Sequence, residues 1–266
     1  MLRHALPARF SPRFFAGRIL WHSGLCRHFE ITTELYRLRF FPTALSCALW
    51  TDPRARQSDE DFYRLYLRRD DTVVDVGANV GTLTLAAAAL VGARGAVWSI
   101  EAHPRTYGYL LENVALNARP NVTPLHAAAG DRRAVMSFSD GWLDDQNRVD
   151  EGGPLAVKLE RLDDLVPARR VQLLKIDVEG YELFVLRGAR TVLDGTDCVY
   201  FECAERAYRR YGYAVTDVVA LLEQKGFTVW ERHGTGFSRF VTPHGDHQNL
   251  VAIRAASAAV ERLDLR

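Results

Sequence analysis

Residues 72–81 read Thr-Val-Val-Asp-Val-Gly-Ala-Asn-Val-Gly, and the fold class follows from this stretch. The β-branched run at 72–76 predicts a short, buried strand of a parallel sheet. Gly77 allows a sharp turn after that strand, and Gly81 allows a close approach of the next element. A helix is expected from 80 to 91, so the stretch predicts a strand, a glycine turn and a helix in succession.

The same alternation continues along the chain. Helices are expected between the later strands because apolar residues recur there at helical spacing. A capping box at Ser58-Asp-Glu-Asp61 predicts a helix ahead of the first strand. The alternation indicates an α/β, doubly wound, mostly parallel sheet with an antiparallel C-terminal strand. The further strands are predicted at 96–100, 122–127, 171–176 and 198–201, with a closing antiparallel pair at 227–230 and 250–253.

The glycine turn points to an adenosine ligand. It lacks the middle glycine of the dinucleotide fingerprint, because Asn79 stands in that position, and this departure disfavours the alternative of an NAD-dependent oxidoreductase. Glu101 follows Gly81 by 20 residues, at the end of the second strand, where a carboxylate can accept both ribose hydroxyls. Asp75 adds negative charge beside the turn, which suits a cationic ligand. S-adenosylmethionine is an adenosine that carries positive charge, so it is the predicted cofactor.

Four longer runs carry a family resemblance: VVDVGANVGTLTL (73–85), IEAHPRTYGYLLENVALN (100–117), AAAGD (127–131) and LLKIDVEGYELFVLRGA (173–189). Together they resemble the FkbM-type S-adenosylmethionine-dependent methyltransferases over roughly residues 56–254. The resemblance implies a class I methyltransferase fold, which is Rossmann-like. It also implies methyl transfer to a hydroxyl oxygen of a sugar, glycolipid, polyketide or other secondary metabolite.

The resemblance assigns cofactor positions as well. It places the glycine loop at the methionine end of the cofactor, Glu101 at the ribose, and Ala127 and Ala128 against the adenine. The predicted cofactor-binding set is Asp75, Gly77, Ala78, Asn79, Gly81, Glu101, Ala102, Ala127 and Ala128.

Methyl transfer to a hydroxyl needs a positioned acceptor and a group that takes its proton. Asp177 is the first catalytic candidate because it ends a predicted buried strand, and Glu179 and Glu202 are the next. Alternatively, Asp177 and Glu179 only cap the helix that follows. Asp177 and Glu202 could together hold Mg²⁺, but no third ligand is evident, so a required metal is not expected.

Two loops could also reach the site. The acidic loop 139–153 could cover an acceptor pocket, with Trp142 as a stacking face, although a solvated surface loop is the simpler interpretation. His244 and His247 lie in the late loop and could supply a base. The other histidines considered, His103, His126 and His233, follow no ligand spacing.

Composition excludes several classes. The 266 residues carry a formal net charge of +1, so no overall basic field attracts nucleic acid. The four cysteines form no CxxC pair, which fits a reducing, cytoplasmic location. No apolar stretch is long enough to cross a membrane. The expected partner is a small-molecule, sugar or lipid-linked acceptor, and the oligomeric state is left open.

Residues 1–55 form a basic unit ahead of a methyltransferase domain at 56–266. The first fifty residues hold seven arginines and only two acids, Glu30 and Glu34. A helical extension packed on the domain is expected, and a transit peptide or a peripheral membrane contact is the alternative. A further hypothesis is a membrane-surface binding protein whose methyltransferase fold is vestigial.

Overall fold

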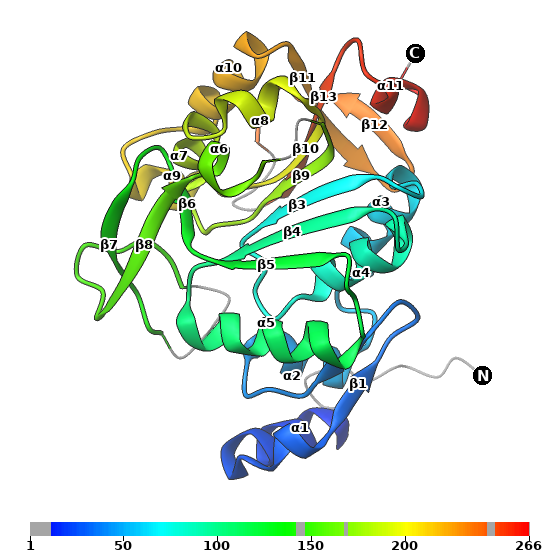
Figure 1. Cartoon of the computed structure of the whole chain (residues 1–266), viewed down its shortest axis with the longest axis vertical. Coiled ribbons are helices and arrows are strands. Elements are labelled where there is room, and N and C mark those ends of the chain that lie inside the picture. The colour runs from blue at the N-terminus through cyan, green and yellow to red at the C-terminus, as the bar shows by residue number, and fades with distance from the viewer. Residues whose placement is uncertain (1–11, 142–146, 168–169, 244–247, 266) are drawn as a thin grey trace.

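The centre of the molecule is an eight-stranded sheet, seen here in a computed structural model that describes residues 12–141, 147–167, 170–243 and 248–265 (Figure 1). The strands lie in the order β5-β4-β3-β9-β10-β13-β11-β12. Their bounds are β3 Thr72–Val76, β4 Ala96–Glu101, β5 Val122–His126, β9 Val171–Ile176, β10 Thr196–Cys203, β11 Phe227–His233, β12 Gly236–Arg239 and β13 Gln248–Arg254.

Strand directions confirm the predicted class. From β5 to β10 each neighbouring pair is parallel, whereas β13 is antiparallel to both β10 and β11. The sheet is therefore α/β and doubly wound, with the expected antiparallel strand near the C-terminus. The edge strand β12 was not predicted, because its four residues show no apolar alternation.

Alternate residues of the strands supply two cores, one on each face of the sheet. Val74, Leu174 and Val199 pack with α7, α8 and α10, while Val73 and Leu173 pack with α3, α4 and α11 on the other face. Figure 1 shows these helices on opposite sides of the sheet. The helices are α3 Gln57–Tyr66, α4 Thr82–Val91, α5 Pro104–Leu116, α6 Leu162–Leu165, α7 Glu182–Arg187, α8 Arg190–Asp194, α9 Glu205–Arg210, α10 Val215–Gln224 and α11 Ala258–Arg262.

The capping box predicted at Ser58 is wrong. Helix α3 begins at Gln57, and the hydroxyl of Ser58 accepts a hydrogen bond from Arg232 instead of from the first turn. The helix itself lies where the sequence places it, since Phe62 and Tyr66 supply the buried face.

The N-terminal extension contains a hairpin as well as helices. Its elements are α1 Pro12–Ser23, the short 3₁₀ helix η2 Leu25–His28, β1 Glu30–Thr32, β2 Arg37–Arg39 and α2 Ala44–Thr51. Leu38, Phe40 and Leu49 of this segment belong to the same core cluster as α4. The domain boundary at residue 55 stays a prediction. In the described part of the chain, no helix is both long and apolar enough to cross a membrane.

A second, three-stranded sheet lies beside the carboxyl ends of the central strands (Figure 1). It consists of β6 Ala128–Gly130, β7 Ala134–Phe138 and β8 Leu155–Arg161, in the order β6-β8-β7. The sequence analysis did not predict it, because β6 is only three small residues and the loop between β7 and β8 is polar.

Candidate active site

A cavity of about 800 Å³ opens at the carboxyl ends of β3, β4, β9 and β10. This volume falls in the range of small-molecule sites, roughly 300–1,000 Å³. Its position matches the ligand crevice of doubly wound sheets. Ten predicted site residues line it together: Gly77, Ala78, Asn79, Glu101, Ala102, Ala127, Ala128, Asp177, Glu179 and Glu202.

The turn after β3 has a conformation that requires glycine. Gly77 has a φ of 77°, and a Cβ there would lie 1.8 Å from the carbonyl oxygen of Asp177. The backbone amides of Gly77 and Ala78 both donate to the carbonyl of Ile100, 3.0 Å away, which joins the turn to the end of β4. Asn79 also has a left-handed φ, 51°, which asparagine tolerates better than most residues.

Glu101 is a buried carboxylate at the end of β4, only 8% exposed. Its two oxygens accept the backbone amides of Asn79 and His103, each at 2.8 Å. Each carboxylate oxygen has a second lone pair, so the group can still accept ligand hydroxyls from the cavity. Burial raises the pKa of Glu101 to about 7, against the opposing effect of the two amide donors.

Two residues of the predicted cofactor set are not among those lining the cavity. Asp75 is buried, and its carboxylate accepts the hydroxyl of Thr84 at 2.6 Å and faces Lys175. Gly81 is the N-cap of α4, with a φ of 94°. The structure thus places both behind the glycine turn, where they support it.

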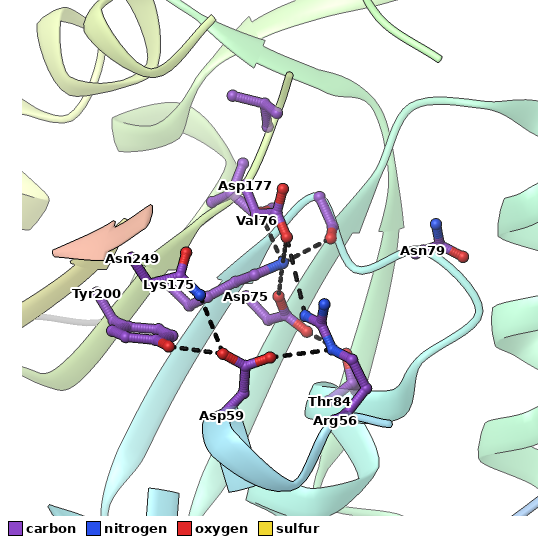
Figure 2. A network of polar contacts seen from close by, with 12 residues as sticks. Arg56, Asp59, Asp75, Val76, Asn79, Thr84, Lys175, Asp177, Tyr200 and Asn249 are labelled. Atoms are coloured by element: carbon purple, nitrogen blue, oxygen red, sulfur yellow. Dashed lines mark hydrogen bonds and ion pairs between the residues drawn. The ribbon is translucent and has the colours of Figure 1, made fainter. Parts of the chain in front are cut away.

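Lys175 is a site residue that the sequence analysis missed. Its ammonium donates to the carbonyl of Gly77 at 2.7 Å and lies 3.1 Å from Asp75 and 3.6 Å from Asp177 (Figure 2). Burial alone would lower the pKa of Lys175, but the two carboxylates outweigh burial and raise it. One feature of the sequence could have identified Lys175. It is a charged residue inside the mostly apolar run 171–176, and the chain has only three lysines.

Arg56 is a second cation next to Asp177. Its guanidinium lies 4.0 Å from Asp177 and 3.1 Å from Asp59 (Figure 2). Asp59 in turn accepts hydrogen bonds from Tyr200 at 2.6 Å and Asn249 at 3.0 Å. This chain of contacts fixes the position of Arg56. No pattern in the sequence around residue 56 predicts that this side chain reaches the cavity.

The capping alternative for Asp177 finds no support among the described residues. The side-chain partners of Asp177 there are the cations Lys175 and Arg56, and no backbone amide donates to its carboxylate. The amide of Val178 is accepted instead by Glu182, at 2.9 Å. Asp177 therefore presents its carboxyl group, 29% exposed, to the cavity.

Three acidic side chains meet next to this carboxylate. Asp177, Glu179 and Glu202 each offer one oxygen, and these oxygens lie within 4.8 Å of one another. Glu179 supplies the third ligand position that was not evident in the sequence, so the cluster has the donor set that Mg²⁺ prefers. Glu179 has a left-handed φ of 56°, which costs of order 1 kcal/mol for a residue with a Cβ. The expectation that no metal is required stays a prediction.

The described histidines do not line the cavity. His103 is the buried N-cap of α5, and its ring contacts Asp140 at 3.2 Å. His126 contacts the carbonyl of Ala102, and His233 contacts Ser238. Trp142, His244 and His247 lie outside the described residues, so the predictions made for them stay predictions.

Arginines gather at another part of the cavity lining. Arg206 and Arg210 lie four residues apart on α9, and Arg148 comes from the loop after β7. Neither Arg206 nor Arg210 has a carboxylate within ion-pair distance among the described residues, although Arg209 between them pairs with Glu205 at 3.5 Å. The cavity therefore combines carboxylates at the strand ends with guanidinium groups from α9.

Curated relatives are methyltransferases. The chain is 30% identical to the hexuronic acid methyltransferase AglP of Haloferax volcanii over 157 residues, which are 56% of this chain and 64% of that protein. The match thus spans less than two thirds of that relative. The chain is 27% identical to methyltransferase 1 of Beauveria bassiana over 187 residues, 60% of this chain and 73% of that protein.

Solved structures and a family model complete the comparison. The FkbM methyltransferase of Methylobacillus flagellatus aligns with a TM-score of 0.46 and 14% identity, covering 90% of this chain and 59% of that one. Aeropyrum pernix fibrillarin, solved with S-adenosyl-L-methionine, aligns with a TM-score of 0.46 and 16% identity, covering 74% of each chain. The family model of the methyltransferase FkbM domain matches residues 75–229, more than half of the chain. The chain belongs to the FkbM family of S-adenosylmethionine-dependent methyltransferases.

Proposed function

We propose that this methyltransferase acts on a hydroxyl oxygen of a sugar that carries an acidic group. The observation that carries the proposal is the position of Asp177, which faces the cavity between Lys175 and Arg56 and shares that cavity with Glu101. The match to a methyltransferase family model supports methyl transfer over the alternative of an NAD-dependent oxidoreductase.

The residues at the ends of β3 and β4 fit an adenosine ligand. Gly77 keeps the turn free of a side chain, and the carboxylate of Glu101 has lone pairs left for ribose hydroxyls. Ala127 and Ala128, buried at the end of β5, offer a flat apolar wall for a purine. When bound, S-adenosylmethionine supplies a methyl group on a positively charged sulfur, so its leaving group needs no further activation.

Asp177 is the proposed proton acceptor. The acceptor hydroxyl would donate its proton to a carboxylate oxygen of Asp177 as its own oxygen gains the methyl group. The bond between the methyl group and the sulfur would break with its electron pair left on sulfur, so a cation and a carboxylate would become a neutral thioether and a neutral acid. Lys175 and Arg56, at 3.6 Å and 4.0 Å, hold that carboxylate in place. Holding the acceptor oxygen in line with the donor supplies the remaining acceleration, as proximity does in other two-substrate reactions.

Arg206, Arg210 and Arg148 are the proposed binders of the acidic group. Guanidinium groups match carboxylates and phosphates in a bidentate geometry. Two of these arginines lack a carboxylate partner in the described chain, so they can bind one from the acceptor. The 30% identity to a hexuronic acid methyltransferase supports the same class of acceptor.

A screen with labelled methyl donor tests this function. The purified chain is incubated with glycosides of hexuronic acids and with the matching neutral hexosides. We expect label on the acidic glycosides, on an oxygen that resists mild base, and much less on the neutral ones. Transfer to neutral sugars alone would refute the acidic acceptor, and transfer to a nitrogen acceptor alone would refute O-methylation.

A cytoplasmic location belongs to the same proposal. All four cysteines are free and buried, which suits a reducing compartment.

A further inference from the structure

Exposed apolar side chains are concentrated in the N-terminal segment 12–29. Seven large apolar residues are exposed in the described chain, and four of them fall in this segment. Phe15 is 55% exposed, Ile19 69%, Leu25 53% and Phe29 42%. Phe15 and Ile19 are four residues apart on α1, so they lie on one face of the helix. A cluster of this kind marks an interaction surface, whereas isolated exposed apolar residues are ordinary.

The same segment carries only positive formal charge. Between residues 12 and 29 there are three arginines, Arg13, Arg18 and Arg27, and the first acid is Glu30. The remainder of the chain is net acidic, so this basic stretch is a local feature. Apolar side chains interleaved with arginines are the composition of helices that lie at the surface of an anionic bilayer.

The opposite face of α1 fixes the segment to the protein. Gly17 is buried against Trp50 of α2, where a Cβ would lie 2.9 Å from the indole ring. Leu20 and Trp21 pack on the core cluster shared with α4. Phe15 and Ile19 therefore face outward from a helix whose other side is packed against the protein. Their exposure does not arise from an unpacked chain terminus.

The segment also lies close to the cavity. Helix α2 contributes Ala44, Leu45 and Ala48 to the cavity lining and Cys47 and Trp50 to the contact with α1. One helix therefore separates the exposed surface from the site. Figure 1 shows α1 at the outer end of the molecule, on the far side of α2 from the central sheet.

We propose that the outer face of residues 12–29 is a docking surface for a bilayer that contains anionic lipids. Phe15, Ile19 and Leu25 enter the boundary between headgroups and acyl chains, and the arginines contact lipid phosphates. The partner is chosen by charge. Arg13 lies over the ring of Trp50 and Arg27 donates to the hydroxyl of Tyr109, but no carboxylate of the described residues lies within ion-pair distance of Arg13, Arg18 or Arg27. A neutral apolar partner would leave these arginines without counter-charges. The proposal is independent of the acceptor proposed above.

Flotation of the full chain with vesicles tests the surface. Vesicles of phosphatidylcholine alone are compared with an equal mixture of phosphatidylcholine and phosphatidylglycerol. We expect flotation with the anionic vesicles, much weaker flotation with the neutral ones, and loss of binding as salt is raised. The double variant Phe15→Ser with Ile19→Ser should lower the partition coefficient at least about tenfold, because two apolar side chains no longer enter the bilayer.

A matched control uses two exposed valines elsewhere. Val135 and Val241 are 70% and 80% exposed, so Val135→Ser with Val241→Ser makes a similar change of surface polarity away from the segment. This control should float as the unaltered chain does, and thermal unfolding of both double variants should be unchanged. Absence of flotation, or an equal loss in the control, would overturn the proposal. So would sedimentation showing a dimer that Phe15→Ser with Ile19→Ser dissociates, since the surface would then bind a second copy.

Discussion

Lys175 and Asp75 are register partners on neighbouring parallel strands, and their side chains form an ion pair of 3.1 Å in which both are almost fully buried (Figure 2). The pair lies directly beneath the glycine turn, and the ammonium also holds the carbonyl of Gly77. A carboxylate and an ammonium removed from water are tolerated only while each has its partner. The pair therefore fixes the turn and the catalytic candidate Asp177 in one rigid unit.

Replacing Lys175 by Met should strongly destabilise the chain. The change leaves Asp75 buried without its counter-charge, and breaking a buried pair in this way costs about 3–5 kcal/mol. Lys158→Met is the matched control, because Lys158 is exposed on β8 and its change should stay within about 0.5 kcal/mol. Urea unfolding of both variants measures the difference. Equal free energies of unfolding would show that the ion pair does not hold the turn.

Gly77→Ala should be far more damaging than Gly212→Ala. Both glycines have a φ of 77°, so both variants carry the same left-handed strain, of order 1 kcal/mol. At Gly212 a Cβ meets nothing within 4 Å, whereas at Gly77 it would lie 1.8 Å from the backbone of Asp177. Gly77→Ala must therefore shift β3 or β9 and should also weaken donor binding. Melting curves and donor titration of the two variants check this, and equal effects would contradict the close approach.

The strands around the glycine turn were predictable because their signals are local. Runs such as 72–76 and 171–176 are buried on both faces of the sheet, so continuous β-branched and aliphatic residues mark them. The small sheet β6-β8-β7 and the β1-β2 hairpin have no such signal. Their strands are half exposed or only three residues long. In the small sheet, the pairing partners also lie some way along the chain, as Ala128 with Leu159 shows.

The site was predictable only where its residues end strands. Glu101, Asp177 and Glu202 follow from the topology of the sheet, and the structure does bring them to one cavity. Arg56 precedes the first strand of the central sheet and follows no strand end of it, so only the tertiary fold places it at the cavity. Arg206 and Arg210 follow the end of β10 within a few residues, but the sequence does not show which side of α9 faces the cavity. Asp75 shows the opposite case. The sequence showed a charge beside the turn and predicted contact with the cofactor, but the carboxylate faces Lys175, a hundred residues later in the chain.

Donor binding should strengthen from pH 6 to pH 8. The pKa of Glu101 is raised to about 7, so the carboxylate that would accept ribose hydroxyls is mostly protonated at the lower pH and ionised at the higher. If only the ionised form binds, the affinity for S-adenosylmethionine rises about tenfold across this range. Calorimetric titration measures it, and Glu101→Gln should bind weakly with no such dependence. A flat profile in the unaltered chain would remove Glu101 from the ribose site.

Ionisation of Glu101 should lower the free energy of unfolding as the pH rises, although it strengthens donor binding. Its pKa in the folded chain exceeds the ordinary value of 4.5, so the folded state binds more protons between these two values. The stability that Glu101 contributes is present below about pH 4.5 and is lost as the pH rises to about 7. The loss is about 3 kcal/mol for a shift of this size. Glu101→Gln should flatten that part of the pH profile of unfolding, and an unchanged profile would contradict the raised pKa.

Arg206→Ala should weaken binding of an acidic acceptor without affecting the donor. A charge-assisted hydrogen bond contributes about 1.5–3 kcal/mol, so KM for a hexuronic acid acceptor should rise about tenfold or more while kcat changes little. Arg209→Ala is the matched control, because Arg209 lies on the same helix, pairs with Glu205 and does not line the cavity. Steady-state kinetics on both variants test it. Equal effects, or an effect on a neutral acceptor as well, would argue against recognition of the acid.

Asp177→Asn should abolish most turnover while donor affinity stays close to that of the unaltered chain. The change keeps the shape of the side chain but removes the charge that takes the proton, and a general base contributes on the order of 10²-fold or more. The donor side of the cavity, from Gly77 to Glu101, is untouched. Single-turnover rates, donor titration and a melting curve on this variant separate the three effects.

Glu179→Gln and removal of metal distinguish a base from a cation ligand. If Asp177 is a base, Glu179→Gln keeps most of the activity and EDTA has no effect. If Asp177, Glu179 and Glu202 hold a divalent cation, with their oxygens within 4.8 Å of one another, both carboxylate variants lose activity together and EDTA abolishes turnover until Mg²⁺ is restored. Near-normal turnover in Asp177→Asn would exclude both roles for this residue. The proton would then be taken by Glu179, by Glu202 or by a histidine of the late loop, and loss of turnover in Glu179→Gln, in Glu202→Gln, or in His244→Ala with His247→Ala would tell these apart.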